Sequence, residues 1–311
     1  MIALLLIPAI ILIGSGYFFL YRFTIHISVF FRHQPAAIGF LILSAFTSLP
    51  EIFCVIYSLH SHYTAVPLPL VIGSNVFNFT LLLGLVVWRY PLKVSGFHRE
   101  EDLWVQILLG FILFLNFIYT PKIHPLTFTI VLILFILFGY LVRKSVLRNL
   151  NERQLPTFTY IKTHPILALL YGLLMTFFGS ILLVESGQAI SLVFGGKDIL
   201  TSALLIGSIT SIPEFLLTIF LIRKNISSVA ISNLMGSGVF NWAVVFVFPL
   251  FFLGSYDDNV INYRCMFVAY FFSLIAVYFY MYLKRKTSIK LFDSLFFMAI
   301  YILFGYWLFF C

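Results

Sequence analysis

Two glutamates lie deep inside long apolar stretches, and they are the residues of this chain best placed to do chemistry. Of the eleven acidic residues, only Glu51 and Glu214 have such surroundings, while Glu185 lies near the end of another stretch. If these stretches cross a membrane, a carboxylate at their centre is costly unless it is paired, hydrated or bound to a cation. The two glutamates are therefore candidates for a buried cation site.

Each glutamate closes a short polar motif that occurs twice in the chain. The sequence TSLPE at 47–51 returns as TSIPE at 210–214, and GSNVFN at 73–78 returns as GSGVFN at 236–241. Both pairs are 163 residues apart, and an ungapped alignment of the 34 residues around them gives 11 identities. Chance similarity between apolar segments would match Leu and Ile, whereas here Thr, Pro, Glu, Gly, Ser and Asn match. The chain therefore contains an internal repeat.

Both motifs place oxygen-bearing side chains at helical spacing. A threonine precedes each glutamate by four residues, a serine precedes each closing asparagine by four, and such pairs share one helix face. The proline beside each glutamate donates no backbone hydrogen bond, which frees a carbonyl about one turn earlier. Carboxylate, hydroxyl, amide and carbonyl oxygens suit Ca²⁺, Na⁺ or Mg²⁺ rather than zinc or copper. The candidate ligands for such a cation are Thr47, Glu51, Ser74, Asn78, Thr210, Glu214, Ser237 and Asn241.

The composition fits a membrane protein, because 62% of the 311 residues are hydrophobic and only 10% are charged. Soluble domains carry about 25% charged residues. Apolar runs of about 20 residues, long enough to cross a bilayer, recur along the chain and are continuous rather than alternating. We therefore predict an all-α membrane protein with ten transmembrane helices. The predicted spans are 2–21, 36–59, 66–88, 103–120, 124–142, 165–185, 200–222, 228–253, 262–283 and 289–310.

The basic residues predict the orientation of these spans. Sixteen of the 19 Lys and Arg residues follow odd-numbered spans, and only Lys122, Lys197 and Arg264 fall on the other side. Because cytoplasmic loops carry the excess of Lys and Arg, both termini are predicted to be non-cytoplasmic. The net charge of +8 is thus explained by topology, and no nucleic-acid partner is expected.

The span count divides the chain into two five-helix halves. The first half is 1–142, with its repeat at about 36–88, and the second is 165–311, with its repeat at about 200–253. The basic segment 143–164 between them is predicted to be a cytoplasmic linker. An odd number of spans per half inverts the second half relative to the first, which is typical of secondary transporters with a site at the repeat interface. The prolines in the second and seventh spans, and the Gly, Ser and Asn residues in the third and eighth, predict four broken helices.

The duplicated motifs resemble the α-repeats of the sodium/calcium exchanger superfamily, in which G-T-S-x-P-E and G-S-N-x-x-N or D each occur twice. The resemblance covers about 45 residues in each half, and Val184-Glu185-Ser186-Gly187 is similar to the family's helix that leads into the second repeat. It implies ten helices in two inverted halves around a central cluster of ion sites. It also implies that Glu51 and Glu214 are shared acidic ligands, with the threonines, serines and asparagines of the motifs around them.

Several positions depart from that pattern. Phe46 and Ile209 stand where the family has glycine before Thr-Ser, and a bulky residue there is expected to restrict close helix packing. Gly238 replaces an asparagine, and Asn241 stands where many members carry aspartate. The site therefore has one carboxylate fewer than in those members.

The expected function is secondary-active antiport of Ca²⁺ against Na⁺ by alternating access around a midplane site. Two alternatives stay open: an exchanger of the same fold coupled to H⁺ or K⁺, suggested by Asn241 and the lost glycines, and a cation-binding scaffold without transport, suggested by Phe46 and Ile209. The chain has neither a P-loop nor a His-x-x-x-His zinc motif, so no enzyme is expected. The expected partners are inorganic cations and the lipid bilayer of the plasma membrane, no cofactor is expected, and the sequence does not define an oligomeric state.

Overall fold

A computed structural model gives the fold of the protein. It describes residues 2–30, 45–90, 92–93, 164–223, 260–284 and 288–310, together with single positions and short runs between 107 and 136 and between 230 and 242. The predicted fourth and fifth spans, the linker, most of the eighth span and the start of the second lie outside the described residues.

The described part of the chain is helical apart from one short ladder and the connecting turns. Six of its helices are long and apolar enough to cross a membrane. They correspond to the predicted spans one, three, six, seven, nine and ten, and the shorter helix Leu49–His60 is the second part of span two. The protein is therefore an all-α integral membrane protein, as its composition predicts.

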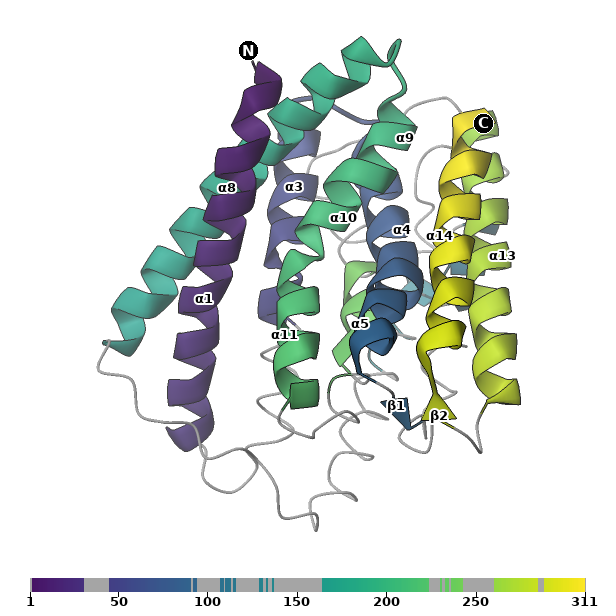
Figure 1. Cartoon of the computed structure of the whole chain (residues 1–311). Helices are drawn as coiled ribbons and strands as arrows, with labels where there is room; N and C mark the ends of the chain where they lie inside the picture. The colour runs from purple at the N-terminus through teal and green to yellow at the C-terminus, as the bar shows by residue number, and fades with distance from the viewer. Residues whose placement is uncertain are drawn as a thin grey trace.

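The elements, in chain order, form three groups side by side (Figure 1). A short 3₁₀ helix, η1 (Ile2–Leu5), leads into α1 (Leu6–Phe30), which crosses α8 (Pro165–Val193) on one side. The centre holds α3 (Leu49–His60), α4 (Pro67–Phe77), η2 (Asn78–Leu82) and α5 (Leu83–Arg89), then α9 (Asp198–Thr201), η4 (Ser202–Ile206), α10 (Gly207–Thr210) and α11 (Ile212–Arg223). The pair α13 (Val260–Leu283) and α14 (Leu291–Phe310) lies on the other side.

Two helices extend beyond their predicted ends. The first helix continues to Phe30 rather than 21, and α8 continues to Val193 rather than 185. Gly195 and Gly196 follow α8 with φ of 78° and 79°, the left-handed conformation that terminates helices and that glycine adopts without strain. The polar residues Glu185, Ser186 and Gln188 therefore lie inside a helix that the apolar pattern alone ends too early.

The third span is continuous, where a broken helix was predicted. Pro67 lies in the first turn of α4, where a missing N–H is harmless. The chain then passes from α4 through the π-helical segment η2 into α5 without leaving helical geometry. Single π-helical turns inside α-helices often occur at functional sites, and Asn78 of the repeat motif is the first residue of this one.

Equivalent helices of the two repeats run in opposite directions. From its proline, α3 runs toward the end of the molecule where the chain termini lie (Figure 1), and the hydroxyl of its Tyr57 donates to Glu185 of α8. From its own proline, α11 descends to Arg223, which donates to the Tyr90 hydroxyl at 2.8 Å beside β1. The α1 and α8 helices are antiparallel in the same way (Figure 1).

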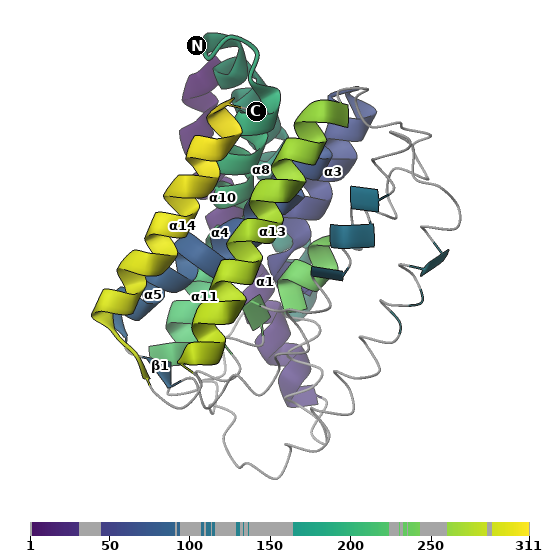
Figure 2. The same ribbon diagram turned by 90° about the vertical axis from the view of Figure 1, so that its right-hand side faces the viewer.

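A two-residue β-ladder lies at the end of the molecule opposite the chain termini. Strand β1 (Leu92–Lys93) pairs antiparallel with β2 (Ser288–Ile289), with Leu92 opposite Ile289. Figure 2 shows β1 below the helices, away from the N and C labels. The segments after the third and ninth predicted spans therefore lie together at this end of the molecule.

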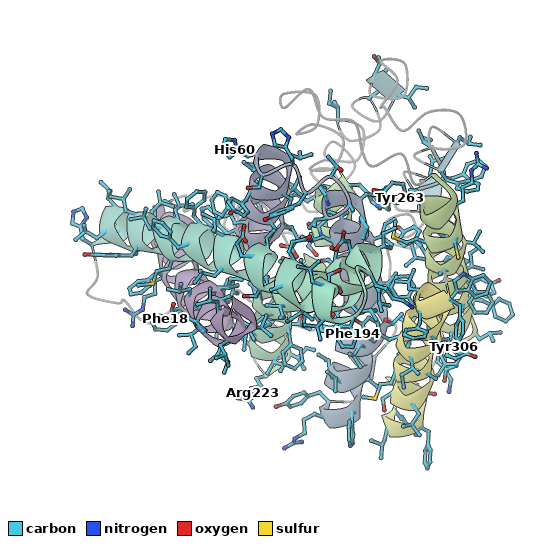
Figure 3. The ribbon with its side chains drawn as sticks, turned by 90° about the horizontal axis from the view of Figure 1, so that it is seen from above. Phe18, His60, Phe194, Arg223, Tyr263 and Tyr306 are labelled. Carbon is cyan, nitrogen blue, oxygen red and sulfur yellow. The ribbon has the colours of Figure 1, made fainter. Side chains whose placement is uncertain are left out.

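The outside of the bundle is apolar. Figure 3 views the molecule along its helices, with Tyr306 of α14 and Phe18 of α1 at the periphery. Both side chains are at least half exposed, as are Phe272 and Ile302 on α13 and α14. A helix surface that exposes large apolar side chains on this scale faces lipid.

Candidate functional site

The two TSxPE motifs have the same local backbone. Helix α10 ends at Thr210, α11 begins at Ile212, and Ser211 between them has φ −82° and ψ 4°. Its counterpart Ser48, directly before α3, has φ −87° and ψ 4°. Pro50 and Pro213 cannot donate to the preceding turn, so the helix stops and restarts there. The predicted breaks in the second and seventh spans are thus present at equivalent serines.

Each break places its glutamate in the first turn of a new helix. Glu51 lies in the first turn of α3 and Glu214 in that of α11, and both side chains are fully buried. Backbone N–H groups at a helix start favour negative charge by roughly 0.3–1 kcal/mol. The helix restart therefore offsets part of the cost of a carboxylate in an apolar region.

The helices that carry the motifs approach each other backbone to backbone. A Cβ on Gly73 of α4 would lie 2.0 Å from the carbonyl oxygen of Ala203, and one on Gly207 of α10 would lie 2.7 Å from that of Leu70. Small residues at both contacts let the two halves meet this closely. The expectation that Ile209 would restrict close packing was wrong, because the close contact is made two residues earlier, at Gly207.

Glu51 sits in a hydrogen-bond network that crosses between the halves. Its Oε1 accepts a hydrogen bond of 3.0 Å from Ser74, whose Oγ lies 2.8 Å from the Oγ of Ser211. Asn241 donates to Ser74 Oγ at 3.3 Å and to Asn75 Oδ1 at 3.2 Å. Residues from both repeats therefore share one buried polar cluster.

Glu214 has a different environment. It interacts electrostatically with Glu51, and the side chain of Thr47 stands beside it. Neither of its carboxylate oxygens has a hydrogen-bond partner among the described residues. Glu51 is likewise approached by Thr210. The threonine of each repeat thus meets the glutamate of the other repeat, because the break at each serine separates a threonine from the glutamate four residues later.

The cluster is rich in hydrogen-bond acceptors that no described residue satisfies. Buried oxygens without a described hydrogen-bond partner are found on both glutamates, on Asn78 and on Asn241. Buried polar atoms are nearly always paired, and an unpaired buried atom is costly. No lysine, arginine or histidine in the described part of the chain pairs with either glutamate. A cation is the partner that such a set of oxygens fits.

The donor set also indicates which class of cation fits. The described residues contain no group of three or more His, Cys, Asp and Glu side chains that would suit a transition metal. The cluster instead combines two carboxylates with hydroxyl and amide oxygens, the hard donors preferred by Ca²⁺ and Na⁺. Residues able to approach one cation are found in both halves.

All eight predicted ligand residues are fully buried, but they are not equally connected. Six of them (Thr47, Glu51, Ser74, Thr210, Glu214 and Asn241) are joined by the contacts above. Ser237 donates to the carbonyl of Leu234 in its own helix at 3.1 Å. Asn78 has no described hydrogen-bond partner. Six of the predicted ligand residues are thus connected to one another, whereas Asn78 and Ser237 have no described hydrogen bond to the other six.

Three contributors were not among the predicted ligands. Ser211 bridges to Ser74, Asn75 accepts from Asn241 and donates to the carbonyl of Gly238 at 3.3 Å, and Gly207 permits the close helix contact. The duplicated Thr-Ser pair was a signal for Ser211. Asn75 lacked one, because its counterpart in the second repeat is glycine.

Fold and site together define an integral membrane protein of the transporter class, with a buried acidic site between two inverted repeats. A family model described as "Sodium/calcium exchanger protein" matches residues 1–144 and 164–310, so the chain belongs to the sodium/calcium exchanger family. The family is one of antiporters rather than enzymes, and its members exchange cations such as Na⁺ and Ca²⁺.

Individual relatives agree with this assignment. The chain is 24% identical over 308 residues to the uncharacterized membrane protein MJ0091 of Methanocaldococcus jannaschii, covering 94% of this chain and 97% of that protein. It is 33% identical to the sodium/calcium exchanger MaX1 of Methanosarcina acetivorans over 114 residues, which is 35% of this chain and 31% of MaX1. A structure of the sodium-calcium exchanger NCX_Mj, soaked with Na⁺ and Sr²⁺, matches 97% of both chains with a TM-score of 0.63 and 22% identity. That structural likeness concerns the fold.

Proposed function

We propose that this protein is a secondary-active antiporter that exchanges Ca²⁺ for Na⁺ at the cluster around Glu51 and Glu214. The observation that carries the proposal is a pair of fully buried, electrostatically coupled carboxylates, one from each inverted half, without a basic partner among the described residues. Two like charges at close range in a low-dielectric interior repel strongly. A bound cation removes that repulsion.

Charge balance limits what the site holds at one time. Two ionised glutamates neutralise one Ca²⁺ or two Na⁺, so either ion relieves the same repulsion and excludes the other. Ca²⁺ takes six to eight oxygens, which the glutamates, Asn78, Asn241, the threonines and the serines supply between them. Competition for one charge-limited site is the physical basis of exchange.

Alternating access in this proposal comes from helices that rock around the fixed site. The breaks at Ser48 and Ser211 lie beside the glutamates, and broken helices at the repeat interface are the usual carriers of ion sites in such transporters. The halves of the proposed mechanism are 1–142 and 165–311, joined by the cytoplasmic linker 143–164. Both termini then face away from the cytoplasm, and we place the protein in the plasma membrane.

A flux experiment tests this proposal. Purified protein in vesicles loaded with Na⁺ is diluted into Na⁺-free buffer that contains ⁴⁵Ca²⁺, and uptake is compared with that under K⁺ and pH gradients. Uptake driven by Na⁺ alone is expected. Glu51→Gln and Glu214→Gln are expected to lower it at least about 100-fold, since each removes one of the two carboxylates that balance the bound cation, and removing one partner of a buried ion pair costs roughly 3–5 kcal/mol.

Glu185→Gln is the matched control. Glu185 is a half-buried carboxylate outside the cluster, where it accepts hydrogen bonds from Tyr57 and Tyr63 at 2.6 and 3.3 Å. This variant should keep uptake within about threefold of the unchanged protein, because it lies outside the cluster and glutamine keeps an acceptor oxygen for the two tyrosine hydroxyls. Full uptake by both cluster variants would rule the proposal out.

A second candidate keeps the site but couples Ca²⁺ movement to K⁺ or H⁺. Asn241 favours it, because an amide in the second GSxVFN motif leaves the cluster with two carboxylates and a donor that is engaged with Ser74 and Asn75. Uptake that persists when Na⁺ is replaced by K⁺ or by a pH gradient would support this candidate over Na⁺ coupling.

A further inference from the structure

The repeat extends beyond the two motifs into the helices that precede them. Shifting Gly16-Tyr17 of α1 by the same 163 residues gives Gly179-Ser180 of α8. The two glycines have equivalent surroundings. A Cβ added to Gly16 would lie 2.8 Å from the backbone nitrogen of Thr176, and a Cβ added to Gly179 would lie 3.0 Å from the backbone nitrogen of Ile13. Thr176 and Ile13 are themselves 163 residues apart. The α1–α8 crossing is therefore symmetric about these glycines.

The residue after each glycine breaks this symmetry. Ser180 donates to the carbonyl of Pro50 at 3.3 Å, and its own carbonyl accepts from Cys54 at 3.7 Å, so it is engaged with the α3 helix start. Tyr17 is 7% exposed, and its hydroxyl has no hydrogen-bond partner among the described residues. Helix α1 packs against α11, which carries Glu214 in its first turn, and the hydroxyl is close enough to feel the charge of Tyr21 and of Glu214. A small, satisfied side chain in one half thus corresponds to a large, unsatisfied one in the other.

The surroundings hold the tyrosine ring in place. Its ring packs on Tyr21 with centroids 6.2 Å apart, and Tyr21 in turn makes an edge contact with Phe220 of α11 at 5.3 Å. Helix α1 cannot shift sideways easily here, because Gly16 touches the α8 backbone. Thr218, one turn after Glu214 on α11, adds a second buried hydroxyl without a described partner. Tyr17 of the first half and Thr218 of the second therefore both present hydroxyl oxygens near Glu214 that have no hydrogen-bond partner among the described residues.

We propose that the hydroxyl oxygen of Tyr17 is a further contact for the cation held at Glu214, supplied by α1, and that Tyr17 is a specificity-determining residue of the site. This inference rests on the proposed function. A phenol oxygen offers lone pairs to a cation while remaining neutral. It thus adds a neutral oxygen ligand near Glu214, whose carboxylate oxygens lack a described hydrogen bond, without changing the charge that limits the site.

Tyr17→Phe tests the inference, since it keeps the ring and removes only the oxygen. The measurement is the Ca²⁺ concentration for half-maximal ⁴⁵Ca²⁺ uptake, with the Ca²⁺-induced rise in unfolding temperature as a second readout. We expect half-saturation to rise about fivefold, the loss typical of one hydrogen-bond-strength contact. The unfolding temperature in cation-free buffer should change little, because the removed hydroxyl has no described hydrogen bond.

Two matched variants separate a cation contact from a structural effect. Tyr21→Phe removes a hydroxyl one turn further along the same helix, and Ser180→Ala removes the hydroxyl at the equivalent place in the other half. Both should leave half-saturation within about twofold of the unchanged protein, whereas Ser180→Ala should lower the cation-free unfolding temperature because it loses a hydrogen bond. A Tyr17→Phe variant with unchanged or tighter Ca²⁺ half-saturation would overturn the inference.

Failure of this inference is distinguishable from failure of the proposed function. If the unchanged protein takes up no Ca²⁺ under any gradient and shows no Ca²⁺-dependent thermal shift, the proposed function has failed and the inference falls with it. If the unchanged protein transports and Tyr17→Phe behaves identically, only the role of Tyr17 has failed.

Discussion

The two halves of this protein carry the same motifs but surround their glutamates differently. Glu51 accepts a hydrogen bond from Ser74 and belongs to a network with Ser211, Asn241 and Asn75. Glu214 accepts none from the described residues. A duplicated sequence thus gives two sites that share a backbone and differ in how their charge is stabilised. One carboxylate oxygen of Glu51 is fixed by Ser74, while both carboxylate oxygens of Glu214 lack a described hydrogen-bond partner.

The largest expected effect concerns the contact that brings the halves together. Gly73→Ala places a methyl group about 2.0 Å from the Ala203 carbonyl oxygen, which forces the backbone apart. We expect a loss of folded protein, with destabilisation at the upper end of the roughly 1–3 kcal/mol typical of overpacking. Gly207→Ala, with its nearest contact at 2.7 Å, should be less severe. Thermal unfolding in detergent measures both.

Gly14→Ala is the control for these two variants. An added Cβ at Gly14 meets nothing within 4 Å, and alanine is the better helix former by about 1 kcal/mol. This variant should unfold at the same or a slightly higher temperature. Equal stability of all three variants would mean that the interface is looser than the contact distances indicate.

The next prediction concerns how replacing each glutamate changes the stability of the protein, rather than its transport rate. In cation-free buffer, Glu214→Gln should raise the free energy of unfolding by about 1–3 kcal/mol, because it removes a buried charge without a hydrogen-bond partner. Glu51→Gln should gain less, since it also weakens the bond from Ser74. Thermal melts of both variants with and without Ca²⁺ give the comparison. A larger gain for Glu51→Gln would reverse our assignment of the unsatisfied carboxylate.

The serines of the two GSxVFN motifs should differ as well. Ser74→Ala removes the hydroxyl that touches Glu51, Ser211 and Asn241, and we expect Ca²⁺ half-saturation to rise about tenfold. Ser237→Ala removes a hydroxyl that donates to Leu234 in its own helix, and the expected rise is about twofold. Radiotracer uptake at graded Ca²⁺ concentrations measures both, and equal shifts would show that Ser237 contributes as much as Ser74.

The smallest expected effect comes from replacing the asparagine that ends each GSxVFN motif. Asn78→Asp adds a carboxylate where the amide has no described partner, so it should favour Ca²⁺ over Na⁺ about threefold at little cost in stability. Asn241→Asp adds the same charge but loses the donor to Ser74 and Asn75, so its unfolding temperature should fall. Competition of Na⁺ with ⁴⁵Ca²⁺ uptake and thermal melts test the pair. A stable Asn241→Asp variant would mean that the amide bonds carry little weight.

Much of this could be predicted from the sequence, because the features depend on local chemistry or on composition. Prolines next to Glu51 and Glu214 predict the helix breaks, and the fixed offset of 163 predicts equivalent backbones at Ser48 and Ser211. The burial of all eight predicted ligand residues also agrees with the prediction. Their role in binding ions remains a prediction.

Other features depend on which helix lies opposite, and a single sequence does not contain that information. The crossing of threonine and glutamate between repeats arises from antiparallel packing, and helical spacing alone instead pairs Thr47 with Glu51. The close contact at Gly207 does not follow from the sequence for the same reason, because the motif pattern places the packing glycine at the position of Ile209, two residues later. In the sequence, nothing distinguishes Tyr17 from the many other aromatic residues, and its importance depends on the packing of α1 against α11.

The contacts at Gly73 and Gly207 also limit how such a protein can evolve. Where helices touch through main-chain atoms, their separation is fixed by the peptide unit and does not respond to changes in side-chain size. Ion selectivity in such a protein therefore cannot change by making the cavity between these helices wider or narrower. It must change by the exchange of one oxygen donor for another, and Asn241, an amide where many members carry a carboxylate, is a change of that kind.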